Sequence, residues 1–296
     1  ESCDKFCHYC IVPYTRGAEF SRPVSRVLKE AELLIQQGAQ DITLLGQNVN
    51  AYHGLDDQGA EWGLGRLIMH LAQTFPQVQR WRYTTSHPQD ISKDLVMAHR
   101  DCQSLMPLLH LPVQSGSDRV LQAMNRRHTC AQYLGFIHQF RQACPSMAFS
   151  SDFIVGYPTE TDDDFQKTLD LIDTVRYAFG YAFAYSPREG TPGASLPPID
   201  EKIKKIRLQK ILQILQGHQL HFNQSMVGHE TIILIERPGR QARQWIGRTP
   251  YMQSVYIEPD SSIQPGDFVH VKITNGYQNS LTGQVLSIRS HRDANT

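Results

Sequence analysis

The sequence lacks an excess of charge of either sign and lacks any long apolar run. Its 296 residues contain 29 Lys and Arg against 29 Asp and Glu. Bulk charge therefore does not point to a polyanionic partner, and any nucleic-acid surface has to be a local patch. No apolar run is long enough to span a bilayer, and no signal-peptide pattern is present. We predict a cytoplasmic protein with no membrane partner.

Cysteine is scarce, with six residues in the whole chain. Three are scattered along it: Cys102, Cys130 and Cys144. These predict reduced, mostly buried thiols and no disulfide framework, which fits a reducing cytosol. The other three crowd the first ten residues in the spacing C-x3-C-x2-C: Cys3, Cys7 and Cys10.

This cysteine loop predicts a metal site, because thiolates are soft ligands that suit zinc or iron–sulfur clusters. Structural zinc needs four ligands, and an electron-transfer cluster also takes four cysteines. Three thiolates on one short loop favour a four-iron cluster with one iron left open. His8 is an alternative zinc ligand, but it lies directly beside Cys7, where one ion is hard for both side chains to reach. Zinc and unligated thiols stay open as alternatives.

The loop begins almost at the first residue. Only Glu1 and Ser2 precede it, and no initiator methionine is present. A loop that holds a metal normally extends from a strand or a helix, so we expect the natural protein to continue upstream of Glu1.

Helix and strand patterns alternate through residues 24–185. The predicted helices cover 24–37, 64–75, 92–100, 118–124, 129–144 and 162–175. The predicted strands cover 41–48, 80–85, 108–113, 148–155 and 177–185. This alternation predicts an α/β fold, a partial (β/α)6 TIM-like barrel whose first strand, expected before Cys3, is truncated. In such barrels the chemistry lies at the carboxyl ends of the strands.

A proline- and glycine-rich connector, SPREGTPGASLPP, ends this pattern. A long helix is predicted from about Asp200 to Phe222, and its basic residues predict a solvated face: Lys202, Lys204, Lys205, Arg207 and Lys210. From His229 onward, five short β patterns separated by glycine turns predict a small all-β barrel. We place the domains at 1–222 and 223–290, with a tail at 291–296.

The β-rich domain is nearly neutral, with seven Lys and Arg against six Asp and Glu between Asn223 and Thr296. Its arginines are nevertheless clustered, with Trp245 and Tyr251 nearby: Arg237, Arg240, Arg243 and Arg248. Arginine pairs with phosphates and aromatic rings stack on bases, so the cluster predicts an RNA-binding surface. A solvated β-turn is the alternative.

Two parts of the chain resemble known families. C-x3-C-x2-C with Tyr9 before the last cysteine resembles the signature of radical S-adenosylmethionine (SAM) enzymes. In that superfamily the three cysteines hold a [4Fe-4S] cluster, and its open iron binds the amine and carboxylate of S-adenosylmethionine. The β-rich domain resembles the TRAM domain, an RNA-binding module.

The superfamily resemblance implies roles for polar residues at strand ends. Gln47 or Asn48 is expected to bind the amine of the cofactor, with a plain polar turn as the alternative. Asp152 is expected to hold a ribose hydroxyl, and the backbone from Ile154 to Gly156 is expected to pair with adenine.

The segment QSGS follows another predicted strand. Gln114, Ser115 and Ser117 offer an amide, hydroxyls and free backbone N–H groups, which suit ribose or carboxylate oxygens. Ser117 is equally well explained as a helix N-cap, and Glu160 and Thr161 are expected to cap the next helix. Three arginines are candidates for contacting the cofactor carboxylate or RNA phosphate: Arg16, Arg126 and Arg127.

Six motifs together resemble the radical SAM methylthiotransferases: CDKFCHYC, VPYTRG, SRP, LLGQNVNAY, HLPVQSGS and DFIVGYPTET. The QNVNAY turn most resembles the branch that acts on C2 of N6-isopentenyladenosine, next to the anticodon of tRNA. Relatives that act on threonylcarbamoyladenosine in tRNA, or on a ribosomal protein, typically differ at this turn. A non-catalytic RNA-binding zinc protein is the alternative from another class.

The methylthiotransferase resemblance implies a two-part reaction. The cluster, reduced by a donor such as flavodoxin or ferredoxin, splits S-adenosylmethionine to a 5′-deoxyadenosyl radical. The radical takes hydrogen from C2, and a methylthio group is installed there. Family members carry a preceding domain whose three cysteines hold a second, sulfur-donating [4Fe-4S] cluster. We expect that domain upstream of Glu1, and we expect this chain alone to lack the complete activity.

Overall fold

The structure, a computed structural model, describes residues 1–258 and 263–289. It divides into two compact units, Glu1–Leu215 and Gln216–Thr296, which are described separately below. The division falls within helix α8 (Glu201–Ser225), as does the boundary predicted between residues 222 and 223. The predicted tail, residues 291–296, lies outside the described residues, as does residue 290 of the predicted β-rich domain.

The sheet of the first unit consists of the parallel strands predicted from the sequence: β1 (Asp41–Leu44), β4 (Arg80–Tyr83), β5 (Leu108–His110), β6 (Ala148–Val155) and β7 (Phe179–Ala184). Strand β1 pairs with β4, and β5, β6 and β7 pair in that order. Backbone bonds of Trp81 to Ser104 (2.7 Å) and Met106 (3.0 Å) join the two parts just before β5. Neighbouring strands therefore follow chain order, as in the predicted partial barrel.

Helices and 3-10 turns connect these strands: α1 (Val12–Arg16), α2 (Val24–Gln36), η1 (Val49–Ala51), α3 (Leu64–Thr74), η2 (Pro88–Asp90), α4 (Lys93–Asp101), α5 (Asp118–Ala123), α6 (Cys130–Ala143), α7 (Asp162–Val175) and η3 (Pro192–Ser195). Local sequence explains several of their ends. Thr129 and Thr161 each begin a helix with a capping box. Gly38, at φ +91°, follows the end of α2, where only glycine is comfortable.

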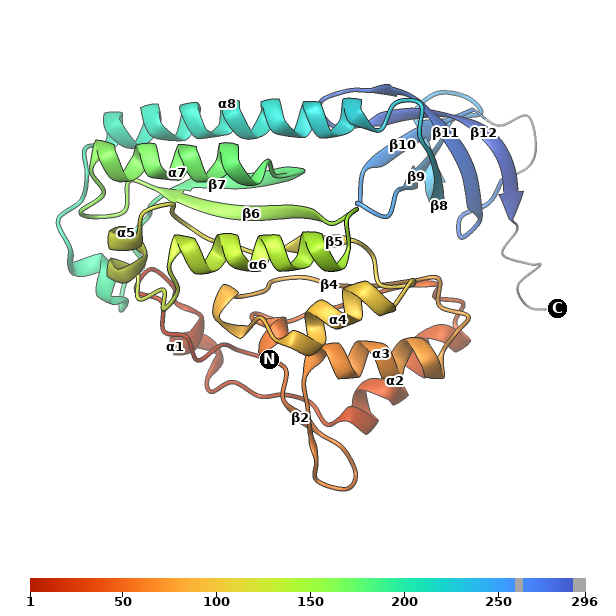
Figure 1. The fold of residues 1–296 in the computed structure, drawn as a ribbon, viewed down its shortest axis with the longest axis horizontal. Coiled ribbons are helices and arrows are strands. Elements are labelled where there is room, and N and C mark those ends of the chain that lie inside the picture. Colours follow the sequence, from red (N-terminus) through yellow and green to blue (C-terminus); the bar gives the residue numbers. More distant parts are fainter. Residues whose placement is uncertain (259–262, 290–296) are drawn as a thin grey trace. The chain divides into compact units, whose positions relative to one another are not determined.

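Helices α6, α7 and the first part of α8 cover one face of the β5–β6–β7 sheet (Figure 1). On β6, Phe149, Phe153 and Val155 point toward these helices and are almost completely buried. Because side chains alternate along a strand, Asp152 and Ile154 point the other way. We call this opposite side of β5, β6 and β7 the inner face.

The sequence did not predict the short hairpin of β2 (Gly54–Leu55) and β3 (Glu61–Trp62) or helix α1. A local signal for the hairpin exists. The Asp56 carboxylate accepts hydrogen bonds from the backbone of Gln58 (3.0 Å) and Ala60 (2.8 Å) and from the Trp62 ring (2.9 Å). In an Asx turn of this kind, the aspartate side chain accepts a hydrogen bond from the backbone N–H two residues further on.

The second unit is a closed barrel of strands in the order β10-β12-β11-β8-β9. Its strands are β8 (Glu230–Pro238), β9 (Trp245–Arg248), β10 (Ser254–Ile257), β11 (Phe268–Gly276) and β12 (Leu281–Arg289). The barrel interior holds β-branched and leucine side chains such as Ile233, Val255 and Val271. Asn223, at the end of α8, donates to Tyr277 O (2.6 Å) and accepts from Gln253 (2.8 Å), which anchors the helix end to this barrel.

The all-β prediction is therefore confirmed. Among the described helices, none combines the length and the apolar composition that crossing a membrane would need.

Candidate active site at the cysteine loop

The cysteine loop is tied to the residues that follow β1 and β4. The backbone N–H of Ser2 donates to Gln47 Oε1 (2.7 Å). The Lys5 ammonium lies 2.6 Å from Asp90 Oδ1, and the other oxygen of Asp90 accepts from Asn48 Nδ2 (2.7 Å). Gln47 and Asn48 thus lie beside the loop, and both help to hold it. Their role as cofactor ligands stays a prediction.

The loop also contacts the residues that follow β5, β6 and β7. The N–H of His8 donates to Met124 O (3.0 Å), and His8 O accepts from the N–H of Gly193 (2.8 Å). Tyr9 packs against a small apolar cluster that contains Met124 and Tyr157. Every strand of the sheet therefore delivers a contact to the loop at its carboxyl end, which is where barrels place their chemistry.

The three thiols differ in exposure. Cys7 is buried, while Cys3 and Cys10 are partly exposed. Burial raises the pKa of Cys3 to about 11 and also raises the pKa of Cys10. The His8 ring donates through Nδ1 to Ala123 O (2.9 Å), so this nitrogen is already used.

Within the part of the chain that the structure describes, no three His, Cys, Asp or Glu side chains are arranged to surround a single metal ion. A four-iron cluster needs a wider spacing than a single ion, because each thiolate binds a different iron. The three cysteines on one loop have the soft donor chemistry that such a cluster requires.

A buried guanidinium lies against the loop. Arg126 is only 6% exposed, and its Nη1 is 3.9 Å from Cys7 Sγ. Its Nη2 donates to Pro112 O. An isolated buried cation costs several kcal/mol unless an anion compensates it. A cluster held by thiolates is such an anion, so Arg126 fits a site built for negative charge.

Several buried polar atoms around the loop have no hydrogen-bond partner among the described residues: Asn48 Oδ1, His87 Nε2, Arg126 Nε, both ring nitrogens of His128, and the Tyr185 hydroxyl. Such atoms are rare in folded proteins and need an explanation. Burial lowers the pKa of His128 to about 3 and puts that of His87 far below its usual range. Both rings are therefore neutral at pH 7, which leaves Arg126 as the charged member of this group. The arrangement fits a site that takes up a polar, anionic group.

The QSGS segment connects strands and helices. Gln114 has φ +77°, its N–H donates to Asp152 O (3.0 Å), and its own C=O accepts from the Ile154 N–H (3.0 Å). Ser115 is fully buried, and its hydroxyl lies 3.3 Å from Thr168 Oγ1. These contacts fix the backbone of the segment to β6 and α7.

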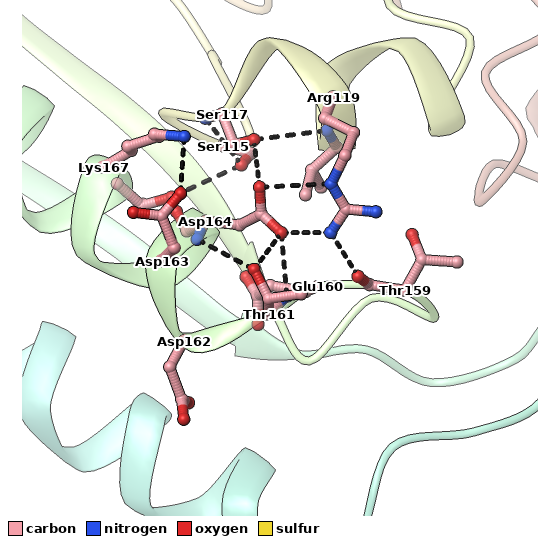
Figure 2. Close-up of polar contacts among 12 residues, drawn as sticks. Ser115, Ser117, Arg119, Thr159, Glu160, Thr161, Asp162, Asp163, Asp164 and Lys167 are labelled. Atoms are coloured by element: carbon pink, nitrogen blue, oxygen red, sulfur yellow. Dashed lines mark hydrogen bonds and ion pairs between the residues drawn. The ribbon is translucent and has the colours of Figure 1, made fainter.

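Figure 2 shows why Ser117 is not free. Its hydroxyl donates to Asp164 Oδ1 (2.6 Å) and accepts from the Val120 N–H, so it is the N-cap of α5. The N-cap alternative for Ser117 is thereby confirmed. The roles of Ser115 and Ser117 as cofactor ligands stay predictions, and in the structure both hydroxyls have other partners.

Asp164 is the centre of the contacts in Figure 2. Its carboxylate also pairs with Arg119 and accepts from the N–H (2.8 Å) and hydroxyl (2.6 Å) of Thr161. Burial alone would raise the pKa of Asp164, but hydrogen bonds from Arg119, Ser117 and Thr161 outweigh it and hold that pKa well below its usual range. This ionised carboxylate ties the segments that follow β5 and β6 to each other.

Two predictions about charged residues hold only in part. Thr161 caps α7, but Glu160 does not, because its carboxylate accepts from the Gly156 N–H (2.7 Å) and pairs with Arg207 (2.6 Å). The basic face of α8 is not wholly solvated either. Lys204 and Arg207 are only 4% and 5% exposed, since Glu160 compensates Arg207 and the Lys204 chain packs over Gly156.

The predicted adenine-binding backbone is partly occupied. The Ile154 N–H already donates to Gln114, and Gly156 uses its N–H for Glu160. Gly156 has φ +70°, and a Cβ there would lie 2.2 Å from Lys204 Cγ, so only glycine fits. Asp152 lies on the inner face, 3.5 Å from His110 Nε2. Its predicted ribose contact, like the adenine contact, stays a prediction.

A cavity of about 280 Å³ opens beside β1, and Gln47 and Asn48 are among its lining residues. Much of the rest of its lining is apolar and comes from α2 and β1. None of the three cysteines lines it. We therefore place the site by the chemistry of the cysteine loop and not by this cavity.

In the second unit, three of the four predicted RNA-binding arginines are exposed: Arg237 at the end of β8, and Arg240 and Arg243 in the turn before β9. Arg248 instead pairs with Glu236 (3.1 Å) and donates to Met252 O (2.9 Å). The two nearby aromatic rings are partly used in packing. Trp245 packs against the barrel core, and Tyr251 lies edge-on to Phe222 at 5.4 Å.

Sequence reasoning missed His87, His128 and Asp164, and it placed Arg126 only as one of three candidate arginines. No local pattern marks these residues. Arg126 and Cys7 are 119 positions apart, and Ser117 and Asp164 are 47 apart, so only the fold brings each pair together.

Comparison with known proteins agrees with this geometry. Residues 1–172 match the Radical SAM superfamily, and residues 224–286 match the TRAM domain. The fold is similar to that of SuiB from Streptococcus suis bound to S-adenosylmethionine, with TM-score 0.50 and 13% identity over 72% of this chain. It is also similar to the radical SAM methyltransferase TsrM from Kitasatospora setae, with TM-score 0.53 and 14% identity over 65% of this chain. The match spans 44% and 37% of those two chains, respectively.

At these identities the two structures show a shared fold and no more. The family match covers more than half of the chain and implies a [4Fe-4S] cluster with S-adenosylmethionine, while the TRAM match suggests RNA binding. The chain therefore belongs to the radical SAM superfamily, and its radical SAM core is followed by a TRAM barrel.

Proposed function

We propose that this chain is the radical SAM and TRAM part of a tRNA methylthiotransferase, tRNA-2-methylthio-N6-dimethylallyladenosine synthase. Such an enzyme installs a methylthio group at C2 of N6-isopentenyladenosine, next to the anticodon. One observation carries the proposal: a C-x3-C-x2-C loop at the mouth of a radical SAM core and an RNA-binding type of barrel belong to the same chain. The six motifs and the QNVNAY turn support the choice of substrate.

The residues of the site would share the work as follows. Cys3, Cys7 and Cys10 would hold the cluster, which when bound supplies the electron that cleaves S-adenosylmethionine. Arg126 compensates negative charge at Cys7. The ligands that we propose for S-adenosylmethionine come from the ends of β1, β5 and β6: Gln47, Asn48, Gln114, Ser115, Ser117, Asp152, Ile154 and Gly156.

The QNVNAY turn shapes one wall of this site. Asn50 is buried, donates to His87 O (2.8 Å) and accepts from the His87 N–H (2.7 Å). The Tyr52 hydroxyl donates to Arg22 O (2.9 Å). A change in this turn would therefore move His87, which lies beside His128 at 5.9 Å between ring centroids. This supports a link between the turn and the choice of substrate.

The three remaining cysteines do not form a second cluster site. All are free thiols, Cys102 is buried and the other two are half-buried. Cys130 and Cys144 lie at opposite ends of the 14-residue helix α6, about 20 Å apart at 1.5 Å per residue. We propose that the second, sulfur-donating [4Fe-4S] cluster is held by residues other than 1–296, and that flavodoxin or ferredoxin supplies electrons.

The test is anaerobic assay of the reconstituted chain with dithionite, S-adenosylmethionine and isopentenylated tRNA. We expect 5′-deoxyadenosine without methylthiolated nucleoside from this chain, and both products from the natural full-length enzyme, measured by mass spectrometry. Full-length enzyme that modifies threonylcarbamoyladenosine tRNA or a ribosomal protein instead would reject the proposed substrate. Complete turnover by residues 1–296 alone would reject the need for the second cluster.

The alternative of a non-catalytic zinc protein has lost its support, because the chain belongs to the radical SAM superfamily. Metal analysis of the reconstituted protein tests the point directly: iron and sulfide are expected, and zinc alone would reject the proposal.

A further inference from the structure

Two aromatic rings of β7 are unusually exposed for strand residues of a parallel sheet. Tyr181 is 53% exposed and Phe183 is 55% exposed. Parallel sheets normally have both faces covered, because helices pack on each side or the sheet closes on itself. Exposed apolar surface of this kind usually marks a binding site.

Both rings lie on the inner face. Gly180 lies between Phe179 and Tyr181 on β7, and a Cβ at Gly180 would lie 2.9 Å from Leu215 Cδ2 of helix α8. Gly180 and Ala182 therefore face the helices. Since side chains alternate, Phe179, Tyr181 and Phe183 project away from them.

The neighbours of these rings place them next to the cysteine loop. Tyr181 is in register with Asp152 on β6, and Phe183 is in register with Ile154. Ile154 and Tyr9 pack against the same small apolar cluster, and Tyr9 lies between two of the cysteines. A group that stacks on Phe183 or Tyr181 would therefore lie on the side of the sheet where the loop sits.

The polar groups beside the rings set the charge of the surface. The His110 ring lies edge-on to Tyr181 at 6.5 Å, donates or accepts at Ser150 Oγ (2.9 Å), and has its Nε2 3.5 Å from Asp152. On this face, Asp152 is the acidic side chain that strands β5, β6 and β7 contribute. On β4, Arg80 and Arg82 pair with Asp41, at 3.8 and 3.0 Å.

We propose that Tyr181 and Phe183 form the platform that binds the acceptor base, an adenine whose N6 carries an apolar substituent. Aromatic rings stack on a purine and pack against an alkyl group. Asp152 accepts hydrogen bonds and repels anions, which disfavours a threonylcarbamoyl group or an aspartate side chain, since both carry a carboxylate. This inference rests on the proposed function and adds the residues that select the substrate.

The experiment measures binding of the anaerobically reconstituted chain to three anticodon stem-loop RNAs. Their target adenosine is unmodified, N6-isopentenylated or N6-threonylcarbamoylated. We expect the wild-type chain to prefer the isopentenylated RNA. Stacking is worth about 1–3 kcal/mol per base, so Tyr181→Ser and Phe183→Ser should each weaken binding of the isopentenylated RNA about tenfold, and losing the contact with its N6-alkyl group should reduce the preference. Met97→Ser, which removes an exposed apolar side chain of helix α4, should leave it unchanged.

Two further variants separate stacking and charge from a loss of structure. Tyr181→Trp should keep the preference, and its indole emission should be quenched by the isopentenylated RNA. Asp152→Asn should raise the affinity for the threonylcarbamoylated RNA severalfold relative to that for the isopentenylated RNA. Circular dichroism confirms that each variant is folded.

The outcomes test the proposed substrate and the proposed aromatic platform separately. If wild-type chain binds the RNAs without preferring the isopentenylated one, the substrate in the proposed function is wrong. If it does prefer that RNA, but both serine variants keep the full preference, the platform is wrong and the proposed function stands.

Discussion

At the scale of single residues, charge compensation explains why Arg126 is buried. A guanidinium is tolerated at 6% exposure only if an anion or several acceptors replace its water. The structure provides one carbonyl, that of Pro112, and one thiol, that of Cys7. We infer that negative charge at the cysteine loop supplies the rest of the compensation for the Arg126 charge. Two predictions test this reading.

The first concerns the ligands. Cys7→Ala should abolish cluster binding after anaerobic reconstitution, because two thiolates cannot retain a four-iron cluster securely. Iron and sulfide content together with the visible absorption spectrum measure the loss. Cys102→Ala, which removes a buried thiol outside the loop, is the matched control and should retain the cluster. If the Cys7 variant retained a full cluster, the cysteine loop would not be the cluster site.

The second concerns Arg126. Arg126→Leu should make the cluster harder to reduce, because a nearby cation stabilises the more negative reduced form. Coulomb's law at an effective dielectric constant of 20 gives a shift on the order of 100 mV. Arg126→Lys keeps the positive charge and should restore most of the wild-type reduction potential. A redox titration followed by electron paramagnetic resonance measures the potential, and an unchanged potential in the leucine variant would contradict the electrostatic role.

At the scale of elements, polar contacts tie the loop after β5 to the loop after β6, in addition to the apolar packing of Met124 and Tyr157. Ser117 and Thr161 each cap a helix, and both hydroxyls also reach Asp164. The buried His99 of α4 plays a comparable part, because it meets the Tyr83 hydroxyl of β4 at 2.8 Å. Such contacts make the local stability sensitive to single substitutions and to pH.

Asp164→Ala should lower the free energy of unfolding by about 2–3 kcal/mol, since it leaves the buried Ser117 hydroxyl and the Thr161 N–H without their acceptor. Asp163→Ala is the matched control. Its carboxylate is 77% exposed and pairs with Lys167, so the change should be under about 1 kcal/mol. Denaturant unfolding measures both. Equal effects of the two substitutions would show that Asp164 does not hold the loops.

His99 gives a pH dependence of defined sign. Burial lowers the pKa of His99 to about 3, against about 6.5 in an unfolded chain. The unfolded state therefore binds a proton first, and stability falls as pH drops from about 6.5 toward 3. The slope from this one group is at most about 1.4 kcal/mol per pH unit.

His99→Gln should flatten the free energy of unfolding between pH 7 and pH 5 by removing that contribution. Exposed His53 is the matched control, and His53→Gln should leave the slope as it is. An undiminished slope in His99→Gln would assign the pH dependence to other groups.

At the scale of the whole molecule, the chain joins a unit with a candidate radical site to a unit of an RNA-binding type. Because the chain is nearly neutral, any affinity for RNA has to come from a local surface. The exposed arginines around the turn before β9 are that surface in our proposal. Arg248 contributes less, because Glu236 already compensates it.

Reversing the charge of Arg240 and Arg243 to Glu should weaken tRNA binding and reduce its dependence on salt by about one unit of slope per lost phosphate contact. Binding measured across a range of salt concentrations shows both effects. Arg100→Glu is a control on the other unit, where Arg100 is exposed and pairs with Asp101. Unchanged tRNA affinity in the double variant would move the RNA surface elsewhere.

The sequence by itself determined the cysteine loop and most of the helices and strands of both units, but not helix α1. It could do so because cysteine spacing, apolar periodicity and glycine turns are local patterns. The predicted helix at 162–175 and strand at 148–155 match α7 and β6 residue for residue. The hairpin of β2 and β3 was not predicted, because strands of two residues are too short to show a periodic pattern.

Only the tertiary structure decided which side chains meet. It set Arg126 against Cys7, gave the hydroxyl of Ser117 to Asp164, and buried Lys204 and Arg207 in a helix face that the sequence alone predicts to be solvated. It also left Tyr181 and Phe183 uncovered. The physical reason is that burial and charge compensation depend on how distant segments pack, and a local pattern does not record its distant partners.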